Sequence, residues 1–131
     1  MRTILVAFSI LIVSLNCLAQ RDGNAVLHEC NAAVDHDDGV KQDAVGTTEA
    51  LACISYVAGY LDAFRVLRVF DSTPGAETRS MFCIPDTNVS TTQVVRIFAK
   101  YLHGHPEHLD ANAAILLTAA LREAFPCGSK P

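Results

Sequence analysis

The fold of this chain is constrained most by its cysteines, which lie far apart in the sequence. Four of them follow the first 20 of the 131 residues: Cys30, Cys53, Cys83 and Cys127. An even number of cysteines in a short chain predicts disulfide bonds if the chain reaches an oxidising compartment. Whether these cysteines form disulfides therefore depends on whether the N-terminal segment is an export signal.

That segment has the parts of a secretory signal peptide. Arg2 supplies an early positive charge, residues 4–15 are apolar apart from two serines, and Ala19 is a small residue at which cleavage can occur. The apolar run is shorter than the about 20 residues that cross a bilayer. We expect residues 1–19 to be removed, which leaves 20–131 as a single helical domain without a membrane anchor.

Removal of the signal changes the cysteine count and the charge. Cys17 leaves with it, so that five cysteines become four, and without Arg2 the 10 basic residues become 9 against 14 acidic ones, a net charge of −5. This acidic balance argues against nucleic acid and anionic membranes as partners, and it suits a basic protein. A lipoprotein, with Cys17 acylated and retained, is disfavoured because Asn16 is bulkier and more polar than the residue such sites need.

Helical periodicity runs through the rest of the chain. Helices are expected over 23–34, 47–70, about 90–103 and 110–124, with a further turn possible after Pro106. Thr47 or Thr48 is the expected cap of the long helix, and Ser90 to Gln93 has the form of a capping box. The last helix is apolar on most sides and is expected to be the central one. No run alternates like a strand, so the predicted fold is all-α, a compact four- to five-helix domain.

Two segments lack an apolar period. Residues 35–46 are acidic and carry two glycines, and residues 71–88 contain Pro74, Gly75 and Pro85. Both are predicted to be connections between helices.

The four cysteines allow three pairings. Cys30 and Cys53 fall on the inward faces of consecutive helices, while Cys83 precedes the third helix and Cys127 follows the last. Antiparallel packing of neighbouring helices favours Cys30–Cys53 and Cys83–Cys127, because this pairing needs the least rearrangement of the chain. On the chain-entropy model each bond stabilises the fold by about 3–4 kcal/mol. A redox role is disfavoured because the chain has no Cys-x-x-Cys motif.

A stripe of small residues follows one side of the long helix. Its members are Ala52, Ser55, Gly59 and Ala63. Small side chains let another backbone approach closely. Packing of a neighbouring helix of the same chain is the favoured interpretation, and contact with a second subunit or a partner is the alternative.

Short motifs follow one another in order between Cys30 and Cys127. They are CISYVAGYLDA at 53–63, FCIP at 82–85, QVV at 93–95, YL with HPE within 101–107, and AL with AFPC within 120–127. This ordered set resembles the Rap/Tai family of type VI secretion immunity proteins over nearly the whole predicted mature chain.

The resemblance implies a periplasmic, mainly helical protein, often a homodimer, that protects a bacterium from an injected toxin. In the amidase branch of the family the toxin cuts peptidoglycan peptides, and immunity works by occluding its active site. A disulfide-held scaffold fits this role because little ordering entropy is lost on binding. Acidic residues would steer the encounter with a basic toxin. The resemblance implies an inhibitor rather than an enzyme, with no catalytic residues, metal or cofactor.

The toxin contact is expected away from the family motifs, in the segments 35–46 and 71–80. Proline and cysteine in the motifs fix the backbone, which indicates a structural role for them. The candidate contact residues are Asp71, Glu77 and Arg79, or the small-residue stripe near Gly59.

Two other functions are alternatives to toxin binding. His103, His105 and His108, with Glu107, are close enough in sequence to suggest zinc, but His103 lies on a polar helical face and the other residues lie in a turn. A periplasmic helical binding or chaperone-like module without a dedicated toxin is the second alternative. A neighbouring type VI effector gene would favour immunity. No Ser-His-Asp arrangement, carboxylate pair or phosphate-binding glycine loop can be identified from spacing, although such groups can converge from distant positions.

Overall fold

The computed structural model describes residues 21–70, 80–85 and 89–128. The predicted signal peptide, 1–19, lies outside the described residues, as do three candidate contact residues, Asp71, Glu77 and Arg79. The described helices are α2 (Gly23–Asp37), α3 (Ala44–Phe70), α4 (Thr91–Gly104), the 3₁₀ turn η3 (Pro106–His108) and α5 (Ala113–Ala124). The described residues form no strand apart from one isolated bridge. The all-α prediction is confirmed.

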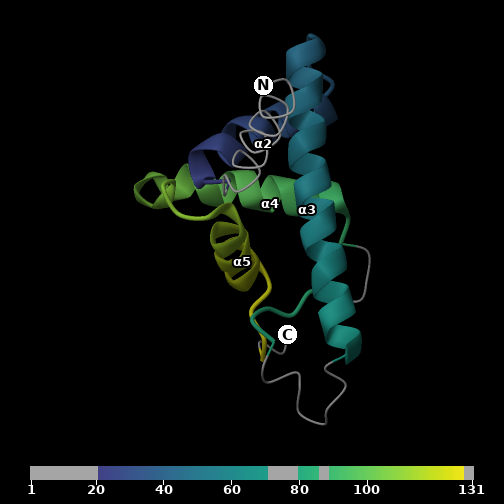
Figure 1. Ribbon diagram of the computed structural model, residues 1–131, viewed down its shortest axis with the longest axis vertical. Coiled ribbons are helices and arrows are strands. Elements are labelled where there is room, and N and C mark those ends of the chain that lie inside the picture. The colour runs from purple at the N-terminus through teal and green to yellow at the C-terminus, as the bar shows by residue number, and fades with distance from the viewer. Residues whose placement is uncertain (1–20, 71–79, 86–88, 129–131) are drawn as a thin grey trace, which may run out of the picture.

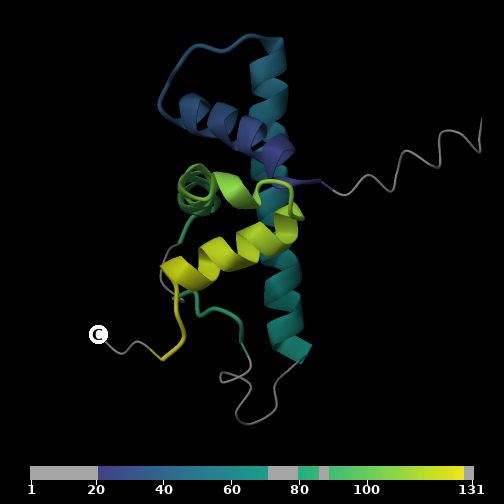
Figure 2. The same cartoon turned by 90° about the vertical axis from the view of Figure 1, so that its left-hand side faces the viewer.

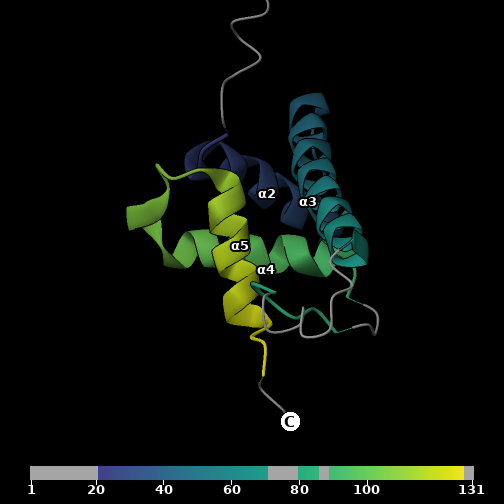
Figure 3. The same cartoon turned by 60° about the horizontal axis from the view of Figure 1, so that its bottom comes forward.

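The other helices are arranged along the long helix α3. Helices α2, α4 and α5 lie on one side of it, in that order from its N-terminal towards its C-terminal part (Figures 1 and 2). Helix α4 contacts α2, α3 and α5, and Figure 3 shows α5 crossing α4. The other side of α3 faces away from these three helices.

The core lies where α2, α4 and α5 meet the inner side of α3. Its largest fully buried side chains are Val26, Val57, Phe82, Val94, Val95, Phe98, Leu102, Leu117 and Leu121. Helix α4 is the central helix, and the expectation that α5 is central was wrong. Ile115 on α5 is 64% exposed, and residues 122–124 are exposed too. The reason is that apolar composition does not determine how many neighbours a helix has.

Local capping sets where the helices begin. Asp43 Oδ1 accepts a hydrogen bond from Gly46 N–H at 2.9 Å, so α3 starts before the predicted caps. The hydroxyls of Thr47 and Thr48 instead donate to backbone carbonyls one turn earlier. Since α2 also continues to Asp37, the predicted 35–46 connection is confined to residues 38–43. The predicted start of α4 is confirmed, because Ser90 Oγ accepts from Gln93 N–H at 3.1 Å.

Both predicted disulfides are present. Cys30–Cys53 joins α2 to α3 with its Cα atoms 5.1 Å apart, and both residues are fully buried. Cys83–Cys127 joins the 80–85 segment to the end of α5, with a Cα separation of 5.0 Å. Beside it, Cys83 N–H donates to Phe125 O at 2.8 Å. The second disulfide therefore ties the approach to α4 to the chain that leaves α5.

The start of α2 fits closely against the chain between η3 and α5. Gly23 N–H donates to Ala111 O at 3.1 Å, and Asn24 N–H donates to Leu109 O at 3.0 Å. A Cβ atom at Gly23 would lie 2.5 Å from Leu116 Cδ1 and 2.9 Å from Leu109 Cα. Glycine is therefore required here by close packing.

Candidate functional site

The side of α3 that faces away from the other helices carries an uncovered strip, which we call the outer face. It consists of Leu51, Ser55, Gly59, Ala63 and Val66, all exposed and spaced at three or four residues. A Cβ atom at Gly59 would meet nothing within 4 Å. Of the predicted stripe, Ala52 is half-buried, while Ser55, Gly59 and Ala63 are exposed. Among the described residues no helix covers these three, so their predicted packing against a neighbouring helix of the same chain was wrong.

The outer face is apolar along most of its length. Residues 50–61 contain no charged side chain, while Glu49 precedes them and Asp62 follows. Glu49 lies 3.3 Å from a nitrogen of His28, and Asp62 forms an exposed ion pair with Arg65 at 2.8 Å. Small residues between larger apolar ones allow a partner's backbone to approach α3 closely.

Helix α3 is long and apolar enough, by length and composition, to cross a membrane. Its inner side, however, carries the buried Cys53, Val57 and Leu61, which pack in the protein core. Only 22% of this apolar stretch is buried, so packing in the core accounts for a small part of its apolar composition.

The end of α2 carries an acidic cluster that is partly neutralised. Arg96 on α4 donates to the carboxylates of both Asp37 and Asp38, with Nε 3.0 Å from Asp37 Oδ2. These hydrogen bonds, that to Asp38 first, raise the pKa of Arg96 further above its ordinary value. The following connection is held to α2 by Gln42 Nε2, which donates to Ala32 O at 2.6 Å. The predicted acidic contact segment is therefore anchored at both of its ends.

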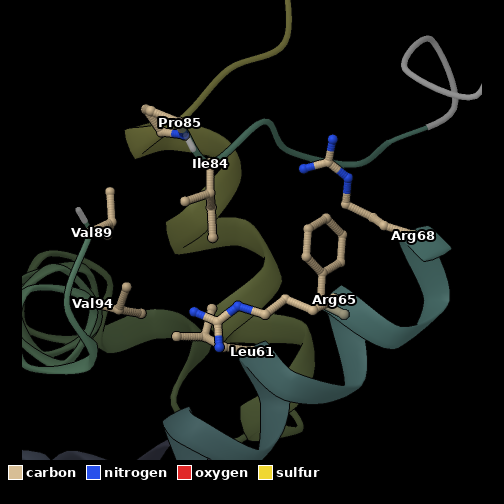
Figure 4. A pocket seen from close by; sticks show the side chains of 8 residues that line it. Leu61, Arg65, Arg68, Ile84, Pro85, Val89 and Val94 are labelled. Carbon is tan, nitrogen blue, oxygen red and sulfur yellow. The ribbon is translucent and has the colours of Figure 1, made fainter. Parts of the chain in front are cut away.

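A pocket of about 340 Å³ lies beside the C-terminal half of α3 (Figure 4). Its apolar lining comes from α3, from the 80–85 segment and from the chain that enters the first turn of α4, and consists of Leu61, Phe64, Ile84, Pro85, Val89 and Val94. Two guanidinium groups, of Arg65 and Arg68, complete it. Sequence reasoning missed this pocket because its lining is drawn from three separate segments, and the only local signal is two arginines three residues apart.

A family model for Rap1a immunity proteins matches residues 22–127, which is most of the chain. The chain belongs to the Rap1a family. No curated protein and no solved structure was found to match it. Membership in the Rap1a family implies an immunity role in type VI secretion, exercised by binding a cognate toxin.

In this Rap1a protein the cysteine-bearing motifs have structural roles. Phe82 is fully buried, and its ring stacks on Phe64 with centroids 4.2 Å apart. Cys83 and Cys127 form the second disulfide. These residues hold the fold, whereas Gly59, within the first of the family-like motifs, lies on the exposed outer face.

The histidines near the end of α4 each have another contact. His103 Nε2 lies 2.8 Å from Asn31 Oδ1, on α2. His105 Nδ1 lies 2.8 Å from Tyr101 O, and its ring stacks on Tyr101. His108 pairs with its neighbour Glu107 at 3.6 Å. The described part of the chain holds no group of three residues able to bind a metal.

Tyr56 on α3 lies beside the N-terminal end of the described chain. The guanidinium of Arg21 is 5.5 Å from the Tyr56 ring centroid and also pairs with Glu29. Burial raises the pKa of Tyr56, the charge of Arg21 opposes this rise in part, and Tyr60 adds a smaller increase. This arrangement ties Arg21, just before α2, to α3.

Proposed function

We propose that this chain is a periplasmic immunity protein that binds and inhibits a cognate type VI secretion toxin. Membership in the Rap1a family supports the immunity role. Two disulfides, one of them fully buried, suit an oxidising compartment such as the periplasm. The proposal includes export by residues 1–19 and a basic toxin, with a peptidoglycan amidase as the first class to try.

The observation that carries the proposal is the uncovered outer face of α3. Its apolar and small side chains stand on a helix whose other side is fixed by the core and by the Cys30–Cys53 disulfide. A preformed, rigid surface loses little conformational entropy when a partner binds. We assign the toxin contact to this face around Gly59, with Asp71, Glu77 and Arg79 of the segment 71–80 as the alternative. Occlusion of the toxin's active site is the proposed mode of inhibition.

The outer face is tested by placing a large charged side chain on it. Gly59→Arg should weaken toxin binding at least tenfold, because the new side chain stands where the partner's backbone must approach. Replacing a mid-helix glycine generally favours the helix, so misfolding does not explain a loss of binding. Calorimetry of the mature chain with each purified type VI effector of the same genome measures the affinity.

Gly104→Arg is the matched control, because Gly104 is also exposed, helical and open to a Cβ atom. It should leave the affinity unchanged. Equal affinities for both variants would place the contact elsewhere. Reversing the charges at Asp71 and Glu77 to lysine tests the loop part separately, and an unchanged affinity would exclude it.

The proposal also includes a homodimer, as the resemblance implies. The mass of the free protein in solution measures this state. If Gly59→Arg converts a dimer to a monomer while toxin affinity is retained, the outer face belongs to the second subunit and not to the toxin. A chain that binds none of the effectors would fit a general periplasmic binding module instead.

A further inference from the structure

The pocket beside the C-terminal half of α3 is separate from the outer face. At about 340 Å³ it falls at the lower end of the range for small-molecule sites, about 300–1,000 Å³. That volume suits one compact apolar group rather than a protein segment. The pocket therefore raises the question of a small ligand.

The apolar part of the pocket is preformed. Leu61 and Val94 belong to the buried core, so their positions are fixed by packing. Phe64 is held by its stacking on the fully buried Phe82. Ile84 follows Cys83 directly, and the disulfide to Cys127 anchors that segment. The side chains of this apolar wall are already fixed, so little conformational entropy would be lost when a ligand binds against them.

The charged part of the pocket is positive in a chain that is acidic overall. Figure 4 shows Arg65 reaching over Leu61 towards Val94, and Arg68 extending on the side of Ile84. Arg65 forms an ion pair with Asp62, which partly neutralises its charge. Arg68 makes no ion pair or hydrogen bond among the described residues, and no carboxylate is among the described lining residues. Guanidinium groups in this setting favour an oxyanion, which they bind through paired N–H donors.

We propose that this pocket binds a small amphiphilic anion, an apolar group that carries one carboxylate or similar oxyanion. The apolar group lies against Phe64, Ile84 and Val89, and the oxyanion lies against the guanidinium of Arg68, which has no partner among the described residues. A neutral apolar ligand fits less well, since it would cover the Arg68 guanidinium without giving it a partner. This site needs no toxin, so its test is independent of the proposed immunity function.

Decanoate is a suitable probe, with decanol as its uncharged counterpart. Calorimetry of the mature chain should show saturable binding of one decanoate and at least tenfold weaker binding of decanol. Arg68→Gln should weaken decanoate binding at least fivefold. Arg122→Gln, the same change on the exposed face of α5, should leave it unchanged.

Methyl NMR spectra locate the bound probe. Decanoate should shift the methyl signals of Ile84 and Val89 but not that of Ile115, which is exposed on α5. The proposal is overturned by an absence of saturable binding, by equal affinity for decanol, or by equal losses in the two arginine variants. Equal shifts at Ile115 would also overturn it, because they would indicate general adsorption to apolar surface.

Discussion

Phe82 shows how a single residue of a short motif can hold several segments together. Its fully buried ring stacks on Phe64 and lies 6.5 Å, centroid to centroid, from Tyr60. Tyr60 in turn donates its hydroxyl proton to Thr118 Oγ1 at 2.6 Å, since the Thr118 hydroxyl donates to Ala114 O. The aromatic cluster thus connects α3, the 80–85 segment and α5.

Phe82→Ala should lower the free energy of unfolding by about 3–5 kcal/mol, because it removes a buried ring and leaves a cavity. Urea unfolding of the oxidised protein measures this change. Met81→Ala is the control, since Met81 is the neighbouring residue but is 58% exposed. A loss of less than 1 kcal/mol for Phe82→Ala would contradict the assignment of this motif to the core.

At the scale of elements, one carboxylate, that of Asp43, determines where the connection between α2 and α3 ends and α3 begins. Asp43 caps α3 by accepting a hydrogen bond from Gly46 N–H. The helix therefore begins about one turn earlier than it would with a cap at Thr47 or Thr48. Gln42, next to Asp43, is held to α2, and Arg96 holds Asp38 at the other end, so the short connection has little freedom.

Asp43→Ala should cost about 1 kcal/mol of stability, the usual value for loss of an N-cap. Asp35→Ala removes the same charge from an exposed position within α2 and should change the stability by less than half as much. Thermal unfolding of the two variants under one set of conditions compares them. Equal losses would indicate a general charge effect and not a cap.

The sequence could predict the helices, the disulfide pairing and the cap at Ser90, because these depend on local periodicity and spacing. It did not predict which helix is central or that the stripe at Gly59 is uncovered. Periodicity reveals which side of a helix is apolar, but it does not reveal which element covers that side. The pocket was missed for a related reason, since Leu61, Ile84 and Val94 meet only in the folded chain.

At the scale of the whole molecule, the proposed binding surface and the scaffold are separated. Helices α2, α4 and α5 lie on one side of α3 (Figure 2), and the buried Cys30–Cys53 disulfide joins α2 to that side. This arrangement leaves the outer face free of these helices. The Rap1a family match covers this whole scaffold, residues 22–127. The central proposal is that the exported chain neutralises a type VI toxin.

Growth of cells that direct a type VI effector of the same genome to their periplasm tests this claim most directly. Co-expression of the full chain should restore growth for one effector, while a chain that lacks residues 2–19 and stays in the cytoplasm should not. Gly104→Arg should protect like the unmodified chain, and Gly59→Arg should protect less. Failure of the full chain to protect against every type VI effector of the genome, or equal protection by the cytoplasmic form, would contradict the account.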